Sequence, residues 1–160
     1  MSQAGHTAET SLGYQAPSIT QFSIFLANKV GKMLALVTGF EDRHVRICAI
    51  AVHEASDHAV VRILAGDADA ARKILTELEV PFMENEILVV SLDGGRSIAA
   101  MCGHLLAAEL SIRFTYPLMA WNGAAPTVAL AMDDVTMAVQ VLRRKEFKLL
   151  GEADLPKYGD

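Results

Sequence analysis

Residues 21–31 read QFSIFLANKVG, and this stretch decides how the rest of the chain is interpreted. An apolar run ends there in a short polar loop, and the glycine of that loop precedes a segment whose apolar residues recur at the spacing of one helix face. Residues 87–97, which read ILVVSLDGGRS, repeat the same order of apolar run, glycine-containing loop and apolar-periodic segment. The chain is therefore predicted to contain two copies of one unit.

The two copies keep their register over most of their length. Val45 matches Ile112 and Asp67 matches Asp134, both at an offset of 67 residues. Each copy is predicted to run strand, helix, strand, strand, helix, strand, with Asp67 or Asp69 capping the second helix of the first copy and Asp134 that of the second. A copy of this length buries little apolar surface alone, so we expect the two to share an interface. The expected strands lie at 19–26, 45–52, 59–65 and 80–83, and again at 87–92, 112–119, 127–132 and 147–150. The corresponding domains are a flexible tail at 1–18, a first unit at 19–84, a second unit at 85–155 and a short tail at 156–160.

The composition is that of a folded protein. The 160 residues are 52% hydrophobic, which suffices for a packed core, and no apolar run approaches the about 18 residues of a membrane span. The polar start lacks the basic and apolar segments of a signal peptide, which predicts a cytoplasmic protein. The net charge is −5 and basic residues cluster only at 143–145, which argues against nucleic acid or a membrane surface as the main partner.

No arrangement of residues in the sequence favours catalysis, a cofactor or a metal. Cys102 and His104 lie two apart on an expected helix, so they face different directions and do not form a nucleophile pair. His53 and His58 could meet across a hairpin, but two histidines without a further ligand at fixed spacing make a weak metal site. Phosphate-binding, dinucleotide-binding and nucleophile-elbow motifs do not occur. We therefore expect no enzyme activity and no cofactor, and interpret Cys48 and Cys102 as reduced thiols.

Three segments resemble the ACT domain, a small ligand-sensing module with a βαββαβ ferredoxin-like fold. They are residues 25–31, 44–47 and 67–75, and the resemblance extends over residues 19–155 as two tandem copies. The family's loop commonly reads Asn-x-Pro-Gly, and Val30 stands here where the proline is common. The resemblance implies an α+β fold with antiparallel sheets and helices on one face, and an amino acid ligand where two units meet. It also implies a regulatory role, because the regulatory subunits of acetolactate synthase resemble ACT proteins too.

This resemblance places a candidate ligand site on two loops and two arginines. In the first loop a glycine amide stands at a helix start, where free backbone donors and the helix dipole favour an anion. A guanidinium at the start of the second strand of a unit is suited to clamp a carboxylate, and we expect Arg113 to reach the first loop at the boundary of the two units. The second loop has its glycines at other positions, so two equivalent sites are not expected. The candidate ligand-binding residues are Asn28, Lys29, Val30, Gly31 and Arg46 in the first unit and Asp93, Gly94, Gly95 and Arg113 in the second.

Other interpretations of these residues and of the chain remain open. Asn28 and Gly31 fit a loop that only turns the chain and caps a helix, and the arginines fit solvated charges on edge strands. For the whole chain we favour an amino-acid-binding regulator of a biosynthetic enzyme such as acetolactate synthase. We also expect a homodimer, because the edge strands around Ile50 and Leu118 are apolar. The alternatives are a structural oligomerisation protein without a ligand, a thiol enzyme, and an RNA-binding module on the same fold, which the lack of aromatic residues in the third strand disfavours.

Overall fold

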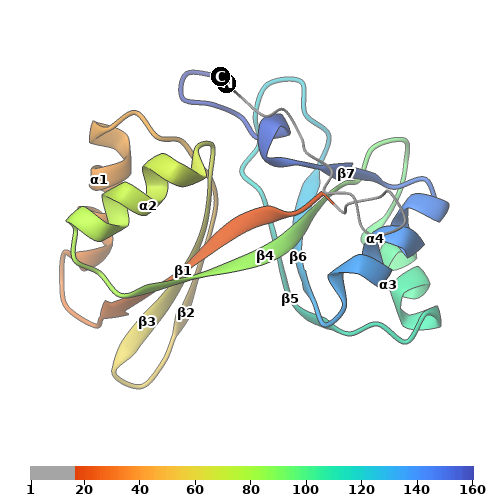
Figure 1. The fold of residues 1–160 in the computed structure, drawn as a ribbon, viewed down its shortest axis with the longest axis horizontal. Helices are drawn as coiled ribbons and strands as arrows, with labels where there is room; N and C mark the ends of the chain where they lie inside the picture. Colours follow the sequence, from red (N-terminus) through yellow and green to blue (C-terminus); the bar gives the residue numbers. More distant parts are fainter. Residues whose placement is uncertain (1–16) are drawn as a thin grey trace. The chain divides into compact units, whose positions relative to one another are not determined.

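The structure is a computed structural model that describes residues 17–160 (Figure 1). It contains two compact units, which we call the N-terminal unit and the C-terminal unit. The N-terminal unit is formed by Thr20–Asn85 together with Leu155–Asp160, and the C-terminal unit is formed by Glu86–Asp154 together with the described residues 17–19. The tail predicted for residues 1–18 falls, up to residue 16, outside the described residues.

The N-terminal unit has the order βαββαβ along the chain. Its elements are β1 (Ile19–Ala27), α1 (Lys32–Asp42), β2 (Ile47–Glu54), β3 (His58–Ala65), α2 (Ala68–Glu77) and the first part of β4 (Phe82–Ser91). The strand order is β2-β3-β1-β4. Alternate residues of β1, among them Phe22 and Ile24, point into one core with Leu36 of α1 and Ile74 of α2. The two helices therefore cover one face of the sheet, as the resemblance to the ACT domain implies.

The C-terminal unit repeats this arrangement. Its elements are the second part of β4, then α3 (Ile98–Ala107), β5 (Ile112–Pro117), β6 (Thr127–Met132), α4 (Val135–Arg144), β7 (Lys148–Leu150) and a short 3-10 helix, η1 (Glu152–Asp154). The strand order is β7-β4-β6-β5, with β4, β6 and β5 paired antiparallel. Leu88 and Val90 of β4 share a core with Leu105 of α3 and Leu142 of α4. The predicted fold class, an α+β protein of two ferredoxin-like units, is confirmed.

Strand β4 differs from the sequence prediction. Two short strands are expected at 80–83 and 87–92, whereas the structure has one strand of 10 residues. Its exposed first part lies beside β1 at the edge of the N-terminal sheet, where the Phe25 N–H donates to the Pro81 carbonyl at 2.9 Å. Its buried second part lies between β6 and β7 in the C-terminal sheet. The polar residues between the two expected strands are typical of a loop. They are also compatible with an exposed edge strand, whose side chains face solvent, and this is why the sequence pattern does not show that the strand is continuous.

The helix starts follow the sequence closely. Asp67 accepts a hydrogen bond from a first-turn amide of α2 at 3.0 Å, and Asp134 accepts one from a first-turn amide of α4 at 2.9 Å. Ser97 caps α3 in the same way at 3.0 Å. Each such cap stabilises a helix by about 0.5–2 kcal/mol. Helix α1 differs, because its N-cap residue is Gly31 and no side chain caps it.

Glu84, on the exposed part of β4, is bound by Arg72 of α2. The Arg72 guanidinium donates to the Glu84 carboxylate at 2.9 and 2.5 Å, and to Asp69 at 2.8 Å. The hydrogen bonds from Arg72 lower the pKa of Glu84 below its ordinary value, and those to Glu84 and Asp69 raise the pKa of Arg72. This pair ties α2 to the edge strand of the same unit.

Glu84→Gln is expected to lower the free energy of unfolding at neutral pH by less than about 1 kcal/mol, because both partners are more than a third exposed. The pKa of Glu84 is lower in the folded than in the unfolded chain. Its contribution is therefore present above the unfolded pKa of about 4.3 and lost as the pH falls through the folded value. The melting temperatures of wild type and variant should differ at neutral pH and converge in acid. A difference that widens as the pH falls contradicts this assignment.

Candidate functional site

The loop between β1 and α1 contains four of the predicted ligand residues. Asn28, Lys29 and Val30 are exposed, and Val30 is 106% exposed, so its side chain contacts little of the protein. Gly31 has φ of 84°, in the left-handed region that favours glycine, while an added Cβ would meet no atom within 4 Å. The glycine is thus required by backbone conformation and not by crowding. Helix α1 lacks a side-chain cap, and the Lys32 N–H donates to the Lys29 carbonyl at 3.3 Å, so the next two amides, of Met33 and Leu34, are left to solvent or to a ligand.

The corresponding loop of the C-terminal unit is longer. It spans residues 92–97, compared with 28–31 in the first, so the second loop differs in length as well as in glycine position. Gly94 and Gly95 have φ of 60° and 77°. Arg96 folds back over the loop, with its guanidinium 3.8 Å from the Asp93 carboxylate and 5.8 Å from the centre of the Phe147 ring. The two loops are therefore not equivalent, as the sequence predicts.

The two predicted arginines have different surroundings. Arg46 directly precedes β2, and its Nη1 donates to the backbone oxygen of Asp160 in the same unit. Arg113 lies on β5, which pairs only with β6 among the described strands, and is exposed. No described residue forms a hydrogen bond or ion pair with its side chain. Arg113 is thus available to a ligand, whereas Arg46 already binds the chain.

A polar cavity of about 380 Å³ lies within the C-terminal unit, and we call it the sheet-face cavity. Ser91 of β4 lies beside Thr127 of β6 and Lys148 of β7 in the sheet register. Because Leu88 and Val90 point into the core that α3 and α4 cover, Ser91 points to the opposite face of the sheet. The cavity is lined by Ser91, Asp93, Trp121, Asn122, Gly123, Ala124, Ala125, Thr127, Lys148, Leu150 and Asp154.

The sheet-face cavity brings opposite charges together beside an aromatic ring. Asp93 and Asp154 supply carboxylates, Lys148 supplies an ammonium, and Trp121 supplies a half-buried indole. The Asp154 carboxylate also accepts from the Gly151 N–H at 2.8 Å, which fixes its position in η1. A cavity of this volume falls within the range of about 300–1,000 Å³ for small-molecule sites. The arrangement matches a zwitterion, whose ammonium and carboxylate need partners of opposite charge.

Sequence reasoning found only Asp93 of this cavity. It missed Lys148, which it placed in a closing strand, and Trp121 and Asp154, for which the repeat gives no signal. A pattern-based argument can find Asp93 because it follows an apolar run. Trp121 is brought in by the connection between β5 and β6, Lys148 by the pairing of β7 with β4, and Asp154 by the turn after β7, which link residues far apart in sequence.

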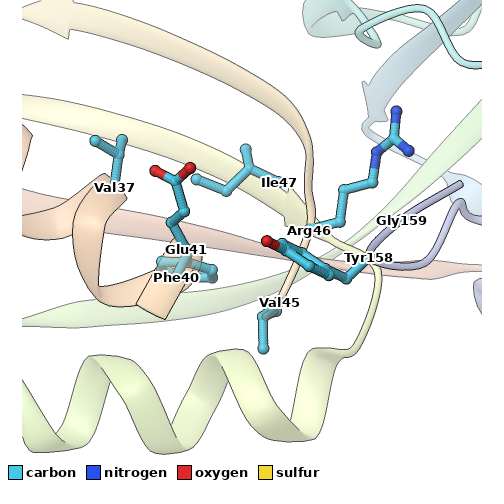
Figure 2. A pocket seen from close by; sticks show the side chains of 8 residues that line it. All are labelled: Val37, Phe40, Glu41, Val45, Arg46, Ile47, Tyr158 and Gly159. Atoms are coloured by element: carbon cyan, nitrogen blue, oxygen red, sulfur yellow. The ribbon is translucent and has the colours of Figure 1, made fainter. Parts of the chain in front are cut away.

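A second cavity of about 350 Å³ lies within the N-terminal unit, and we call it the α1 cavity (Figure 2). It is lined by Val37, Phe40 and Glu41 of α1, by Val45, Arg46 and Ile47, and by Tyr158 and Gly159. Most of these side chains are apolar. Of the predicted ligand residues, only Arg46 lines it.

The remaining chemistry-bearing residues have ordinary partners. Within residues 17–160, no three His, Cys, Asp or Glu side chains are grouped so as to hold a metal ion. His53 lies 2.9 Å from the Arg62 guanidinium, and His58 lies 2.7 Å from Asp57. Cys48 and Cys102 are free thiols. The described helices are all too short or too polar to cross a membrane.

Comparisons with known proteins identify relatives of the chain. The model of a family described as "ACT domain pair" matches residues 17–158. A search of curated proteins finds no match. Among solved structures, protein BT0572 from Bacteroides thetaiotaomicron is 23% identical, with a TM-score of 0.76 over 87% of this chain and 96% of that one.

Two further solved structures share the fold at lower similarity. The regulatory subunit of aspartate kinase from Thermus thermophilus, in its ligand-free form, is 9% identical, with a TM-score of 0.54 over 81% of this chain and 92% of that one. A structure of aspartokinase alpha and beta subunits is 15% identical, with a TM-score of 0.50 over 78% of this chain and 87% of that one. At these identities the likeness concerns the fold.

Proposed function

Because this chain belongs to the ACT domain pair family, we propose that it is a regulatory protein that binds an amino acid or a similar small carboxylate and performs no catalysis itself. The family fits a small-molecule-binding regulatory role. The observation that carries the proposal for this chain is the sheet-face cavity, whose lining includes Lys148, the two carboxylates of Asp93 and Asp154, and Trp121. An amino acid has the charges that this lining complements.

The ligand is proposed to bind with its carboxylate at Lys148 and its ammonium at Asp93 and Asp154. The indole of Trp121 then faces the amino acid side chain, where burial of apolar surface adds affinity. Two further ligand contacts are proposed, one in each unit. The loop at residues 28–31 offers the Met33 and Leu34 amides at the start of α1 to a carboxylate, and Arg113 offers its guanidinium.

A thermal-shift screen of the twenty amino acids should find a stabilising ligand, and Lys148→Ala should weaken its binding about fivefold to tenfold in calorimetry. The loss follows from removing one hydrogen bond to a charged group at a partly exposed site. Arg113→Ala is measured in parallel. A lower affinity for the ligand found in the screen supports a contact with this arginine, and an unchanged affinity removes Arg113 from the proposed contacts.

Lys145→Ala is the matched control, because Lys145 is an exposed lysine at the end of α4 that does not line the cavity. It should leave the affinity unchanged. Equal affinity of wild type and Lys148→Ala removes the lysine from the site. No heat with any amino acid favours the alternative of a structural oligomerisation protein.

We further propose that the protein acts as a homodimer on an amino-acid biosynthetic enzyme, for which acetolactate synthase is one candidate. Val30 in the loop before α1 and Leu34 in the first turn of α1 support self-association, because these apolar side chains are 106% and 68% exposed. Sedimentation at micromolar concentration should show a dimer, and Leu34→Glu should shift it toward the monomer. A wild-type monomer at that concentration contradicts the dimer. Co-purification with the candidate enzyme, with and without ligand, tests the partner.

A further inference from the structure

The α1 cavity has one wall formed by the C-terminal segment, Leu155–Asp160 (Figure 2). The Tyr158 ring extends from this segment toward the side chains of α1, while the Arg46 guanidinium points away from them. The ring is braced from one side by His44, whose imidazole meets it edge-on at 4.6 Å. The aromatic wall of the cavity is therefore held in place by neighbouring groups.

The C-terminal segment is anchored along its length to the N-terminal unit. Leu155 is buried, the Cys48 thiol lies 3.5 Å from the Pro156 carbonyl, and Lys157 donates to the Gly66 carbonyl. At the far end of the segment, Arg46 donates to Asp160. These contacts hold the segment against the N-terminal unit, so that it forms a fixed wall of the cavity.

The two charged residues of the α1 cavity differ in their surroundings. Its lining contains one cation and one anion, Arg46 and Glu41, and the Arg46 guanidinium points away from the α1 side chains and donates to the backbone oxygen of Asp160. The Glu41 carboxylate has no hydrogen bond or ion pair from any residue in the described part of the chain. The rest of the lining is apolar or aromatic. A ligand that matches it carries a positive charge on an apolar body.

We propose that the α1 cavity binds a small organic cation, a primary amine with an aromatic or branched aliphatic body. The ammonium pairs with Glu41, and the body lies among Phe40, Ile47 and the Tyr158 ring, whose face also attracts a cation. This ligand differs in class from the amino acid of the proposed function, because it needs no carboxylate. The lining of the α1 cavity belongs wholly to the N-terminal unit, whereas the lining of the sheet-face cavity belongs to the C-terminal unit.

The test is calorimetry of the full chain with two probes of similar size, phenethylamine and 3-phenylpropionate. Phenethylamine is expected to bind in the millimolar range or tighter, and 3-phenylpropionate at least about tenfold more weakly, since the charge at Glu41 repels it. This comparison uses the wild-type protein alone. Equal binding of the two probes, or no binding of phenethylamine, overturns the proposal.

Two variants then locate the site. Glu41→Gln and Tyr158→Ala should each weaken phenethylamine about threefold to tenfold, because the first removes an exposed charge pair and the second removes the aromatic wall. Glu54→Gln, at an exposed carboxylate on β2 away from the cavity lining, is the matched control and should have no effect. Unchanged affinity in Glu41→Gln overturns the proposal, whatever the amino acid screen of the sheet-face cavity gives.

Discussion

Phe22→Ala is expected to lower the free energy of unfolding by about 3–5 kcal/mol, since removing a fully buried phenylalanine leaves a cavity that the core closes only in part. Phe22 lies on β1 and meets the Phe82 ring edge-on, with the ring centres 5.9 Å apart. Denaturant unfolding measures the change, and the slope of the transition should stay constant if both proteins unfold as one cooperative unit.

Phe25→Ala on the same strand is the matched control. Phe25 is only half-buried and lies 6.2 Å from the His58 ring, on the face of the sheet opposite to Phe22. Its truncation should cost clearly less than that of Phe22. Equal losses in the two variants would contradict the assignment of the N-terminal core to the helix-covered face.

Gly66→Ala is expected to destabilise the protein by about 1–3 kcal/mol, the usual cost of adding a methyl group where none fits. A Cβ at this position would lie 2.4 Å from the carbonyl oxygen of Pro156. Because the obstacle is backbone, the C-terminal segment has to move for the substitution to be accommodated. Thermal unfolding reports the loss, and protease cleavage after Lys157 should become faster as the segment is displaced.

Gly103→Ala separates crowding from the general effect of replacing glycine. Gly103 lies inside α3, and an added Cβ there would meet no atom within 4 Å. Alanine should therefore stabilise the helix by about 0.5–1 kcal/mol. Similar losses in both glycine variants would mean that the contact between Gly66 and Pro156 does not hold the segment.

Much of the fold is readable from the sequence because its signals are local. The cap positions Asp67 and Asp134 follow from helix-start chemistry, and the repeat offset places the second copy without further information. The alternation of Phe22 and Ile24 indicates the buried face of β1. Each of these rules concerns residues a few positions apart, where the chain itself fixes the geometry.

Sequence patterns do not indicate where one strand runs through two sheets, or which residues far apart in the chain come into contact. Glu84 reads as a loop residue, but it lies on a continuous strand whose exposed edge tolerates charge. The hydrogen bond from Arg46 to Asp160, more than a hundred residues away, is likewise one that no local pattern indicates. Trp121 and Lys148 share a cavity only because a hairpin and a strand pairing bring them together. No periodicity records such long-range contacts.

The separation of Leu155–Asp160 from the rest of its unit fixes the order in which the protein is completed on the ribosome. The body of the N-terminal unit, Thr20–Asn85, is synthesised first, but its final segment is synthesised only after the whole of Glu86–Asp154. At synthesis rates of about 5–20 residues per second, this delay lasts some seconds. During that interval Gly66 lacks its cover and the α1 cavity lacks the wall that contains Tyr158. Of the two units, the one whose main body is synthesised first is thus completed last.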